Sequence, residues 1–371
     1  DMLILQTLNN SDGSKSDYPI YGYDGGYKPD VHIVLVDTNN RYFYDNYDGY
    51  KIAYNVWEST RYPDNFFKRL HYFDEVWVPT QWQFDCLVEQ GYPSHKISIV
   101  PEGVDVETFK PLTKIPKKDK FRFLHFGRWD YRKGTTEVLR AFSETFKDRD
   151  DVELIASVEN PYPFDGLKTT EDRVKHHNID TTNIKFIKFT PQEEYVKYLQ
   201  EGDVFVTCAR SEGWNLPLIE AMACGTPSIY SDWGGQLQFA EGKGIPVKID
   251  GLRPANVEHK DFPGEYCEPD WNNLGEQMLN AFNDYKKYIQ KTTKAGSLMS
   301  RQAHMELIIQ NDHPAGLGDT IYYVNNGVKK SSGDVTKITK PTKRQQEEFT
   351  EKNGYPMPNN FIEVNCYMIP E

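Results

Sequence analysis

The chain has 371 residues, of which 38% are hydrophobic and 14% aromatic, and its formal net charge at pH 7 is −12. This composition is typical of a folded globular protein, and the length predicts two domains. An acidic chain lacks the basic surface that duplex nucleic acid and anionic membranes require, so we expect neither as a partner. Any anionic ligand must therefore be held by a local group of cations.

The cysteines are five in number and scattered, and no two of them form a C-x-x-C pair. This pattern argues against both a disulfide framework and a zinc site, and it predicts a reducing, cytoplasmic compartment. No apolar run approaches the ~20 residues of a transmembrane helix. The opening stretch, DMLILQTLNN, has no signal-peptide pattern. The five cysteines are Cys86, Cys208, Cys224, Cys267 and Cys366.

Short apolar runs alternate with amphipathic stretches along most of the chain. The apolar runs predict strands at 2–6, 31–36, 52–57, 75–79, 97–101, 121–126, 152–158, 184–189, 203–209 and 227–231. Helices are predicted at 62–72, 80–90, 134–147, 192–201, 217–223 and 271–290. Apolar runs without strict polar alternation indicate parallel strands that are covered on both faces. The predicted fold class is therefore α/β, with doubly wound parallel sheets.

One stretch, 101–120, is rich in Pro and Lys and has little periodicity, so it predicts a linker between two α/β units. We expect a first domain over 1–112, a second over 113–290 and a C-terminal extension over 291–371, whose packing back on the first domain is left open. Within the extension, the polar stretch KKSSGDVTKITKPTKRQQEE (329–348) is expected to be surface or loosely ordered.

The stretch SEGWNLPLIEAMACGTP (211–227) predicts a tight loop and a short helix directly after a strand. Pro217 suits the first helical turn, where its missing N–H is not needed. Gly213 lets the backbone approach a phosphate closely, and the free amides of 213–216 at the helix start would form an anion site. In open α/β sheets, ligands bind at the carboxyl ends of strands, where this loop would lie.

The stretch HFGRWDYRKG (125–134) also lies between a predicted strand and a predicted helix. Gly127 allows a tight turn, and Arg128 and Lys133 place two cations at the end of the strand. Two cations together with helix amides would hold a pyrophosphate. The positive charge that the acidic chain lacks overall would then be concentrated in one cleft.

These residues carry a resemblance. FGRWDYRKG, SEGWNLPLIEAMACGTP with its two glutamates eight positions apart, and PEGVD between the units resemble family 4 retaining glycosyltransferases of the GT-B fold. The resemblance covers about 97–235 and, more weakly, 52–96. It implies two Rossmann-like domains that face a central cleft, with a nucleotide-sugar bound mainly against the second domain.

The resemblance also implies a reaction. A hexose would move from a nucleotide diphosphate sugar, GDP-mannose or a UDP-hexose, to a hydroxyl of a sugar, glycan or glycoconjugate acceptor. No cofactor and no metal would be required. Whether the chain forms a homo-oligomer is left open. The alternative is a catalytically silent member of the fold that binds nucleotide-sugars or acts as a scaffold. A NAD-dependent dehydrogenase shares the strand–helix alternation, but it needs G-x-G-x-x-G after a first strand, and the sequence has no such match.

The resemblance assigns roles to individual residues. Arg128 and Lys133 would hold the diphosphate, Glu212 would contact hydroxyls of the transferred sugar, and Glu220 would bind the ribose. Where many family members have a histidine after a first-domain strand, this chain has Glu58 and Ser59, which we place on the acceptor or donor-sugar side. The expected donor-binding residues are Gly127, Gly213, Trp214, Asn215, Leu216 and Glu220.

Two further groups of residues allow more than one interpretation. His125 lies at an apolar strand end, and a packed, hydrogen-bonded core residue is favoured over a catalyst. Trp57, Trp77 and Trp82 could form a platform for stacking a sugar, but core packing is favoured for most of them.

Overall fold

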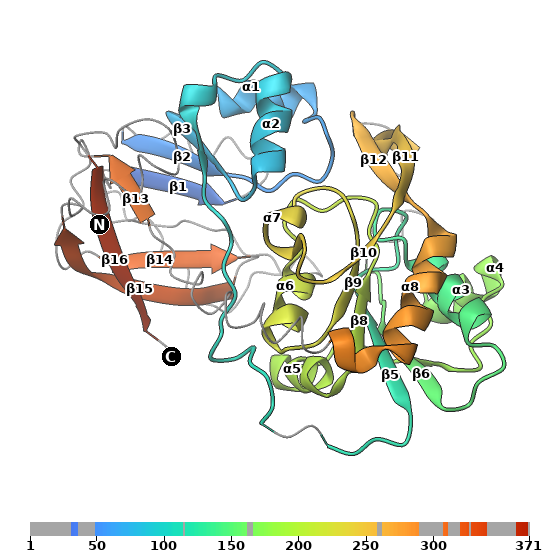
Figure 1. Ribbon diagram of the computed structural model, residues 1–371. Coiled ribbons are helices and arrows are strands. Elements are labelled where there is room, and N and C mark those ends of the chain that lie inside the picture. The colour runs from blue at the N-terminus through green and yellow to red at the C-terminus, as the bar shows by residue number, and fades with distance from the viewer. Residues whose placement is uncertain are drawn as a thin grey trace.

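The computed structural model describes residues 31–35, 49–113, 116–161, 166–257, 262–288, 307–310, 320–325, 328–339 and 361–369 (Figure 1). The strand predicted at 2–6 lies outside these residues. None of the helices in the described part of the chain is long and apolar enough to cross a membrane.

The first unit is a parallel sheet with the strand order β1-β2-β3-β4. In β3 the consecutive residues Val76, Trp77 and Val78 are all buried, so both faces of the sheet are covered, as expected for a parallel strand. The helix α2 begins where the Thr80 hydroxyl accepts a hydrogen bond from the backbone N–H of Gln83. The elements are β1 (Val31–Leu35), β2 (Tyr50–Tyr54), α1 (Asp64–Leu70), β3 (Glu75–Val78), α2 (Gln81–Glu89) and β4 (Ile97–Ile99).

The second unit is a six-stranded parallel sheet with the order β10-β9-β8-β5-β6-β7. Its strands are β5 (Phe121–Phe126), β6 (Val152–Ser157), β7 (Ile184–Phe186), β8 (Val204–Thr207), β9 (Ser228–Ser231) and β10 (Ile245–Val247). The chain builds outward from β5 through β6 to β7, then returns to the other side of β5 with β8. The direction of winding therefore reverses between β5 and β8.

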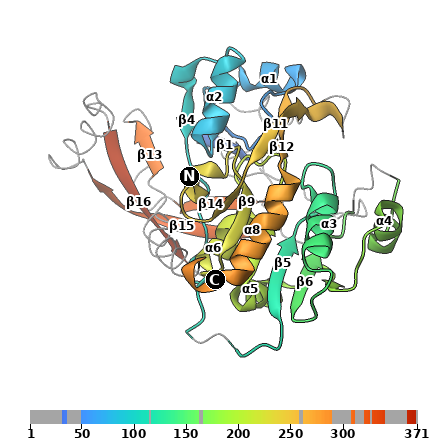
Figure 2. The same cartoon turned by 45° about the vertical axis from the view of Figure 1, so that its right-hand side comes forward.

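Helices cover both faces of this sheet. α3 (Thr135–Thr145) and α8 (Trp271–Asn283) lie side by side on one face, where they pack on Phe123 and Val206 (Figure 2). α5 (Gln192–Glu201) and α6 (Leu216–Ala223) cover the other face, against Leu124 and Phe205. Because neighbouring residues of one strand enter opposite layers, the continuous apolar runs of the sequence are explained. α7 (Leu237–Ala240) follows β9.

The second unit has five elements that were not predicted, namely β10, α7 and the three that follow. α4 (Thr170–His177) starts at a capping box in which Thr169 and Asp172 each accept a hydrogen bond from the other's backbone N–H. The antiparallel strands β11 (Ile249–Pro254) and β12 (Glu265–Pro269) form a ribbon that extends toward the first unit (Figure 1). There the backbone N–H of Thr60 donates to the carbonyl of Glu265 at 3.3 Å. The two units are thus joined by backbone contacts as well as by the segment between β4 and β5.

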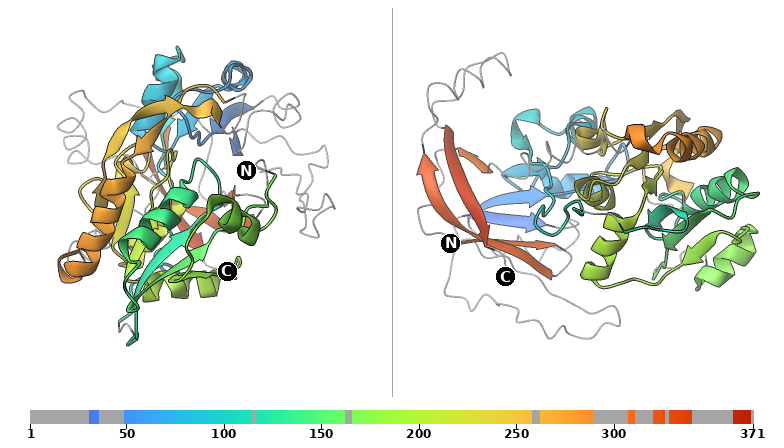
Figure 3. Two further views of the ribbon diagram at one scale, coloured as in Figure 1. Left: turned by 90° about the vertical axis from the view of Figure 1, so that its right-hand side faces the viewer. Right: turned by 60° about the horizontal axis from the view of Figure 1, so that its bottom comes forward.

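The C-terminal strands form an antiparallel sheet with the order β13-β16-β15-β14, which lies beside the first unit in Figures 1 and 3. They are β13 (Leu307–Gln310), β14 (Thr320–Asn325), β15 (Val328–Thr339) and β16 (Phe361–Ile369). Of the two alternatives expected over 329–348, surface or loosely ordered chain, the second is wrong for residues up to Thr339, because they form a strand. β15 pairs with a strand on each side, and these ladders satisfy its backbone although its local sequence is polar. The rest of that stretch lies outside the described residues.

Candidate functional site

The candidate site lies where the winding of the second sheet reverses. Residues 127–134, which we call the cationic turn, follow β5 and lead into α3, whereas residues 208–215 follow β8 and lead into α6. β5 and β8 are paired neighbours, with Phe123 opposite Val204, so both loops leave the same edge of the sheet. In doubly wound sheets this topological switch point is where ligands bind.

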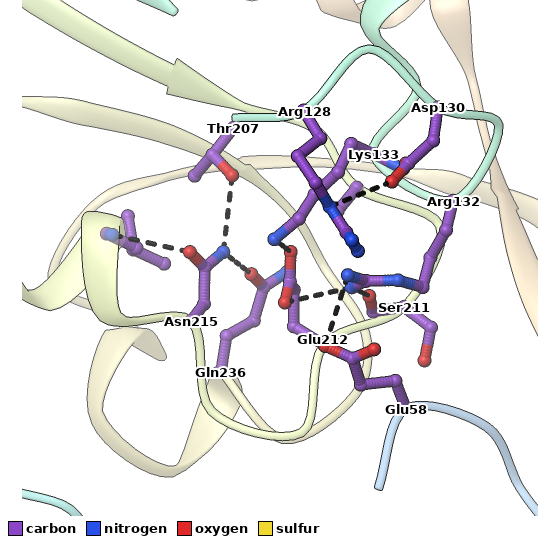
Figure 4. A network of polar contacts seen from close by, with 12 residues as sticks. Glu58, Arg128, Asp130, Arg132, Lys133, Thr207, Ser211, Glu212, Asn215 and Gln236 are labelled. Atoms are coloured by element: carbon purple, nitrogen blue, oxygen red, sulfur yellow. Dashed lines mark hydrogen bonds and ion pairs between the residues drawn. The ribbon is translucent and has the colours of Figure 1, made fainter. Parts of the chain in front are cut away.

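The cationic turn is held in a compact shape by its own contacts. The backbone N–H of Gly127 donates to the carbonyl of Ser157 at 3.0 Å, and that of Lys133 donates to the Asp130 carboxylate at 2.7 Å. The Lys133 side chain passes 3.8 Å from the position that a Cβ on Gly127 would occupy. The turn thereby brings Arg128 and Lys133 toward the same side, as Figure 4 shows.

Glu212 is the acid at the centre of this group. Its carboxylate accepts hydrogen bonds from Lys133 Nζ at 2.5 Å and from Arg132 Nη1 at 3.1 Å. The Glu212 side chain is only 4% exposed. Burial works to raise the pKa of this carboxyl, but the charges of Lys133 and Arg132 outweigh it and hold the pKa below its usual value. The structure therefore brings Lys133 and Glu212 together, with Glu212 ionised.

Sequence reasoning missed Arg132, although it lies next to Lys133. Its side chain is 7% exposed and forms ion pairs at 3.1 Å with Glu212 and with Glu58 of the first unit. It also donates to the carbonyl of Ser211 at 2.8 Å. Burial disfavours the charge on Arg132, but the two carboxylates raise its pKa overall. The signal in the sequence was the adjacent Arg-Lys pair at a strand end in an acidic chain.

Arg128 and Glu58 are the more open members of the group. The Arg128 side chain is 39% exposed, and its Nε lies 3.6 Å from the Asp130 carboxylate. The Glu58 side chain is 43% exposed and reaches Arg132 from the segment that follows β2 (Figure 4). These two side chains are much more exposed than those of Arg132 and Glu212.

The start of α6 supplies backbone groups. The helix begins at Leu216, one residue before the predicted start, with Pro217 in its first turn. Within the described residues, the backbone N–H groups of Gly213, Trp214 and Leu216 donate no hydrogen bond. Leu216 and its neighbours thus keep the backbone donors on which the predicted anion site depends.

Two predicted donor-binding side chains have structural roles in this loop. Asn215 has φ +83° and caps α6, because its carbonyl oxygen accepts from the N–H of Leu218. Its Nδ2 donates to the Thr207 hydroxyl at 3.2 Å and to Gln236 Oε1 at 2.7 Å. The Trp214 ring is 4% exposed and packs on Phe239 in the core. Their prediction as donor contacts therefore rests on their backbone rather than on their side chains.

Gly213 is needed for a second close approach besides the one predicted. A Cβ on Gly213 would lie 2.6 Å from the carbonyl oxygen of Trp57 and 2.6 Å from the Val56 side chain. The loop that carries Glu212 is thus in contact with the first unit at this glycine.

Glu220 lies one turn inside α6, as predicted, and accepts a hydrogen bond from the Tyr195 hydroxyl of α5 at 2.7 Å. This contact places it at the junction of α5 and α6. A shared ligand for Glu220 and the cationic turn stays a prediction.

Ser59 serves as a cross-link. It is 2% exposed, and its hydroxyl accepts from Trp57 Nε1 at 2.8 Å and lies 2.9 Å from the carbonyl oxygen of Pro263 beside β12. The Trp57 ring packs on Tyr62 and Phe262, with ring centroids 5.2 and 5.4 Å away. Ser59 therefore holds the Glu58 segment against the β11–β12 ribbon.

The interpretation of His125 as a core residue is confirmed. It is 2% exposed, with Nδ1 2.8 Å from the carbonyl oxygen of Val206 and Nε2 3.2 Å from the Thr135 hydroxyl. Burial lowers its pKa to about 4, so the ring is neutral at pH 7. Core packing is also confirmed for Trp77, whereas Trp82 packs edge-on against Trp233 of the other unit at 5.1 Å.

Comparison with known proteins finds glycosyltransferases that are similar to part of this chain. Residues 107–244 match the family model of glycosyl transferases group 1. The D-inositol 3-phosphate glycosyltransferase of Corynebacterium urealyticum is 31% identical over 183 residues, which cover 45% of this chain and 43% of that protein. The alpha-monoglucosyldiacylglycerol synthase of Streptococcus pneumoniae is 26% identical over 172 residues, 43% of this chain and 38% of that protein. The chain thus spans less than half the length of these two relatives.

Solved structures share the fold at low sequence identity. HepE of Anabaena in complex with UDP-glucose superposes with a TM-score of 0.56 at 14% identity, covering 73% of this chain and 74% of that one. The sucrose-phosphate synthase of Thermosynechococcus elongatus gives a TM-score of 0.56 at 18% identity, covering 73% and 69%. The chain therefore has the GT-B fold of two Rossmann-like units, and its residues 107–244 match the family of glycosyl transferases group 1.

Proposed function

We propose that this chain is a retaining glycosyltransferase that moves a hexose from GDP-mannose or a UDP-hexose to a hydroxyl of a sugar, glycan or glycoconjugate. One observation carries the proposal. The cationic turn after β5 and the loop after β8 meet at the switch point, where Lys133 binds Glu212, Arg128 lies on the same side of the turn, and the amides before α6 donate to no described residue. Cations and backbone donors of this kind are what a diphosphate requires.

In the proposed reaction the bond from the sugar C1 to the diphosphate oxygen breaks, and the bond from C1 to the acceptor oxygen forms on the same face. The departing diphosphate oxygen takes the acceptor's proton. Arg128 and Lys133 stabilise the negative charge that grows on the diphosphate, and electrostatic stabilisation of this kind usually contributes most to the rate. Lys133 has three N–H donors, so it can contact a phosphate while it stays bonded to Glu212. Glu212 keeps acceptor capacity for the hydroxyls of the transferred sugar.

We propose that the cations, rather than a metal ion, carry this stabilisation. The arginine and lysine side chains of the cationic turn supply fixed positive charge at the point where the diphosphate would lie.

Calorimetric titration with UDP-glucose and GDP-mannose tests the proposal. We expect one of the two to bind the wild-type chain, and we expect Lys133→Ala and Glu220→Ala to weaken that binding while circular dichroism shows an intact fold. For turnover, loss of one cation should reduce the rate about 10²–10³-fold. Normal affinity in both variants would refute the proposal. Arg149→Ala, on the surface of the same unit, is the control that should bind normally.

A catalytically silent nucleotide-sugar-binding or scaffold protein is the second candidate. It is favoured by the charge balance of the group, because the three cations Arg128, Arg132 and Lys133 face carboxylates before any ligand binds. Slow hydrolysis of the bound donor separates the two candidates. Hydrolysis that falls with Lys133→Ala would reject the silent protein, whereas donor binding without any hydrolysis would support it.

A further inference from the structure

Arg210 lies directly behind the cationic turn, on the segment that follows β8. Its side chain is 3% exposed. Its Nη1 donates to the carbonyl oxygen of Tyr131 at 2.6 Å, and its backbone N–H donates to the carbonyl oxygen of Arg132 at 2.6 Å. Arg210 therefore binds two consecutive carbonyls of the turn, immediately before Lys133.

The guanidinium is itself fixed from three directions. Nη2 lies 3.0 Å from Glu137 of α3 and 3.0 Å from Glu268 of β12. The Tyr131 ring lies beneath it, with 3.8 Å between the ring centroid and the guanidinium carbon, and the Trp271 ring lies at 5.0 Å. Trp271 Nε1 donates to Glu268 at 2.6 Å and so fixes that carboxylate.

This arrangement needs the shape of arginine as well as its charge. Burial disfavours the charge, but Glu137 and Glu268 raise the pKa of Arg210 overall. A planar guanidinium can stack on Tyr131 while it donates to a carbonyl and two carboxylates, which a lysine ammonium cannot do.

The cationic turn is also packed tightly against this part of the second unit. Gly134 closes it with φ +64°, and a Cβ there would lie 2.8 Å from the carbonyl oxygen of Cys208 and 2.8 Å from the Trp271 ring. The contacts of Arg210 thus act on a backbone that is packed closely against the end of β8. The side chains of Arg132 and Lys133 leave this backbone toward Glu212.

We propose that Arg210 is a positioning residue for the diphosphate subsite. It holds the backbone of the cationic turn so that Arg132 and Lys133 meet Glu212 and the incoming phosphates in one geometry, and it does not touch the ligand. This inference rests on the proposed function, because it concerns the same subsite. It adds a second layer to that site, which joins α3 and β12 to the phosphate-binding residues.

The first test measures the affinity of UDP and of GDP by calorimetry. For whichever nucleotide the wild-type chain binds, Arg210→Lys should bind about tenfold more weakly, because a charged hydrogen bond to the turn is lost. Arg149→Lys is the matched control and should bind normally. Arg149 also pairs bidentately with a carboxylate, Asp151, and lies 4.5 Å over the Phe282 ring, but it does so away from the turn.

A double-mutant cycle with Lys133→Met distinguishes positioning from general support of the fold. If Arg210 acts through the turn, Arg210→Lys should weaken binding less than about threefold once Lys133 is gone. The same factor in both backgrounds would overturn the positioning role. Should Arg210→Lys fail to fold, Glu137→Gln replaces it, with a smaller loss of affinity that must also shrink in the Lys133→Met background.

The outcomes separate the two proposals. A folded wild-type chain that binds neither UDP nor GDP at millimolar concentration would overturn the proposed function, and this inference with it. Wild-type binding with unchanged affinity in Arg210→Lys would overturn the positioning role alone.

Discussion

Replacing Arg132 with methionine should destabilise the protein far more than the same replacement of Arg128. Arg132 is one of two cations paired with the buried Glu212 carboxylate, so its loss leaves that charge with Lys133 alone. Removing one partner of a buried ion pair costs about 3–5 kcal/mol of unfolding free energy. Because Glu212 keeps its contact with Lys133, we expect the lower end of this range, about 3 kcal/mol, for Arg132→Met. Arg128 is 39% exposed and 3.6 Å from its partner Asp130, so its replacement should cost about 0–1 kcal/mol.

Urea unfolding at pH 7, followed by tryptophan fluorescence, measures both variants against the wild type. A double variant, Arg132→Met with Glu212→Gln, should recover part of the lost stability, because it also removes the uncompensated buried charge. The reasoning is refuted if Arg132→Met is no less stable than Arg128→Met, or if Glu212→Gln makes Arg132→Met still less stable.

Three further predictions concern the frame of the site. The pKa of His125 is lowered to about 4, so between pH 6.5 and about 4 the unfolded chain binds a proton that the folded chain does not, and the protein should lose about 3 kcal/mol of stability over this range. The urea midpoint should therefore fall less between pH 7 and pH 4.5 in His125→Gln than in the wild type, and an equal fall would contradict this. Gly134→Ala should lower the melting temperature more than Gly166→Ala, because both glycines have positive φ but only Gly134 would place a Cβ against Cys208; equal melting temperatures would count against the close contact. Asn215→Ala should cost at least about 1 kcal/mol of unfolding free energy through the lost cap of α6, and a value near zero in chemical denaturation would exclude the capping role.

The meeting of Lys133 with Glu212 could be anticipated from the sequence because it depends on topology. Each residue follows a predicted strand, and the strand order of a doubly wound sheet places those two strand ends side by side. Pro217 and Gly225 likewise mark the ends of a short helix through local backbone preferences, and α6 begins one residue before Pro217 and ends two residues before Gly225. Local signals and a general rule of sheet order were sufficient for these features.

Other parts of the site depend on contacts between distant segments, which local patterns do not contain. The role of Arg132 depends on its ion pair with Glu58, a residue of the other unit. Trp214 lies beside the predicted site in the sequence, but its ring turns into the core against Phe239. The β11–β12 ribbon has little apolar alternation, and part of its support comes from Thr60 across the two units. Such features follow from packing rather than from propensity.

The strand β15 was not predicted because it, too, depends on contacts between distant segments. Its sequence, VKKSSGDVTKIT, is polar and contains a glycine, so composition favoured an irregular segment. In the structure it pairs with β14 on one side and β16 on the other. Hydrogen-bonded partners on both sides override a weak local preference.

A crystal structure of the chain soaked with UDP or GDP would test the central claim most directly. The account predicts that the diphosphate lies at the ends of β5 and β8, within hydrogen-bond distance of Lys133 Nζ and of the backbone N–H groups that precede α6. A nucleotide bound elsewhere, with Lys133 still bonded only to Glu212, would contradict it.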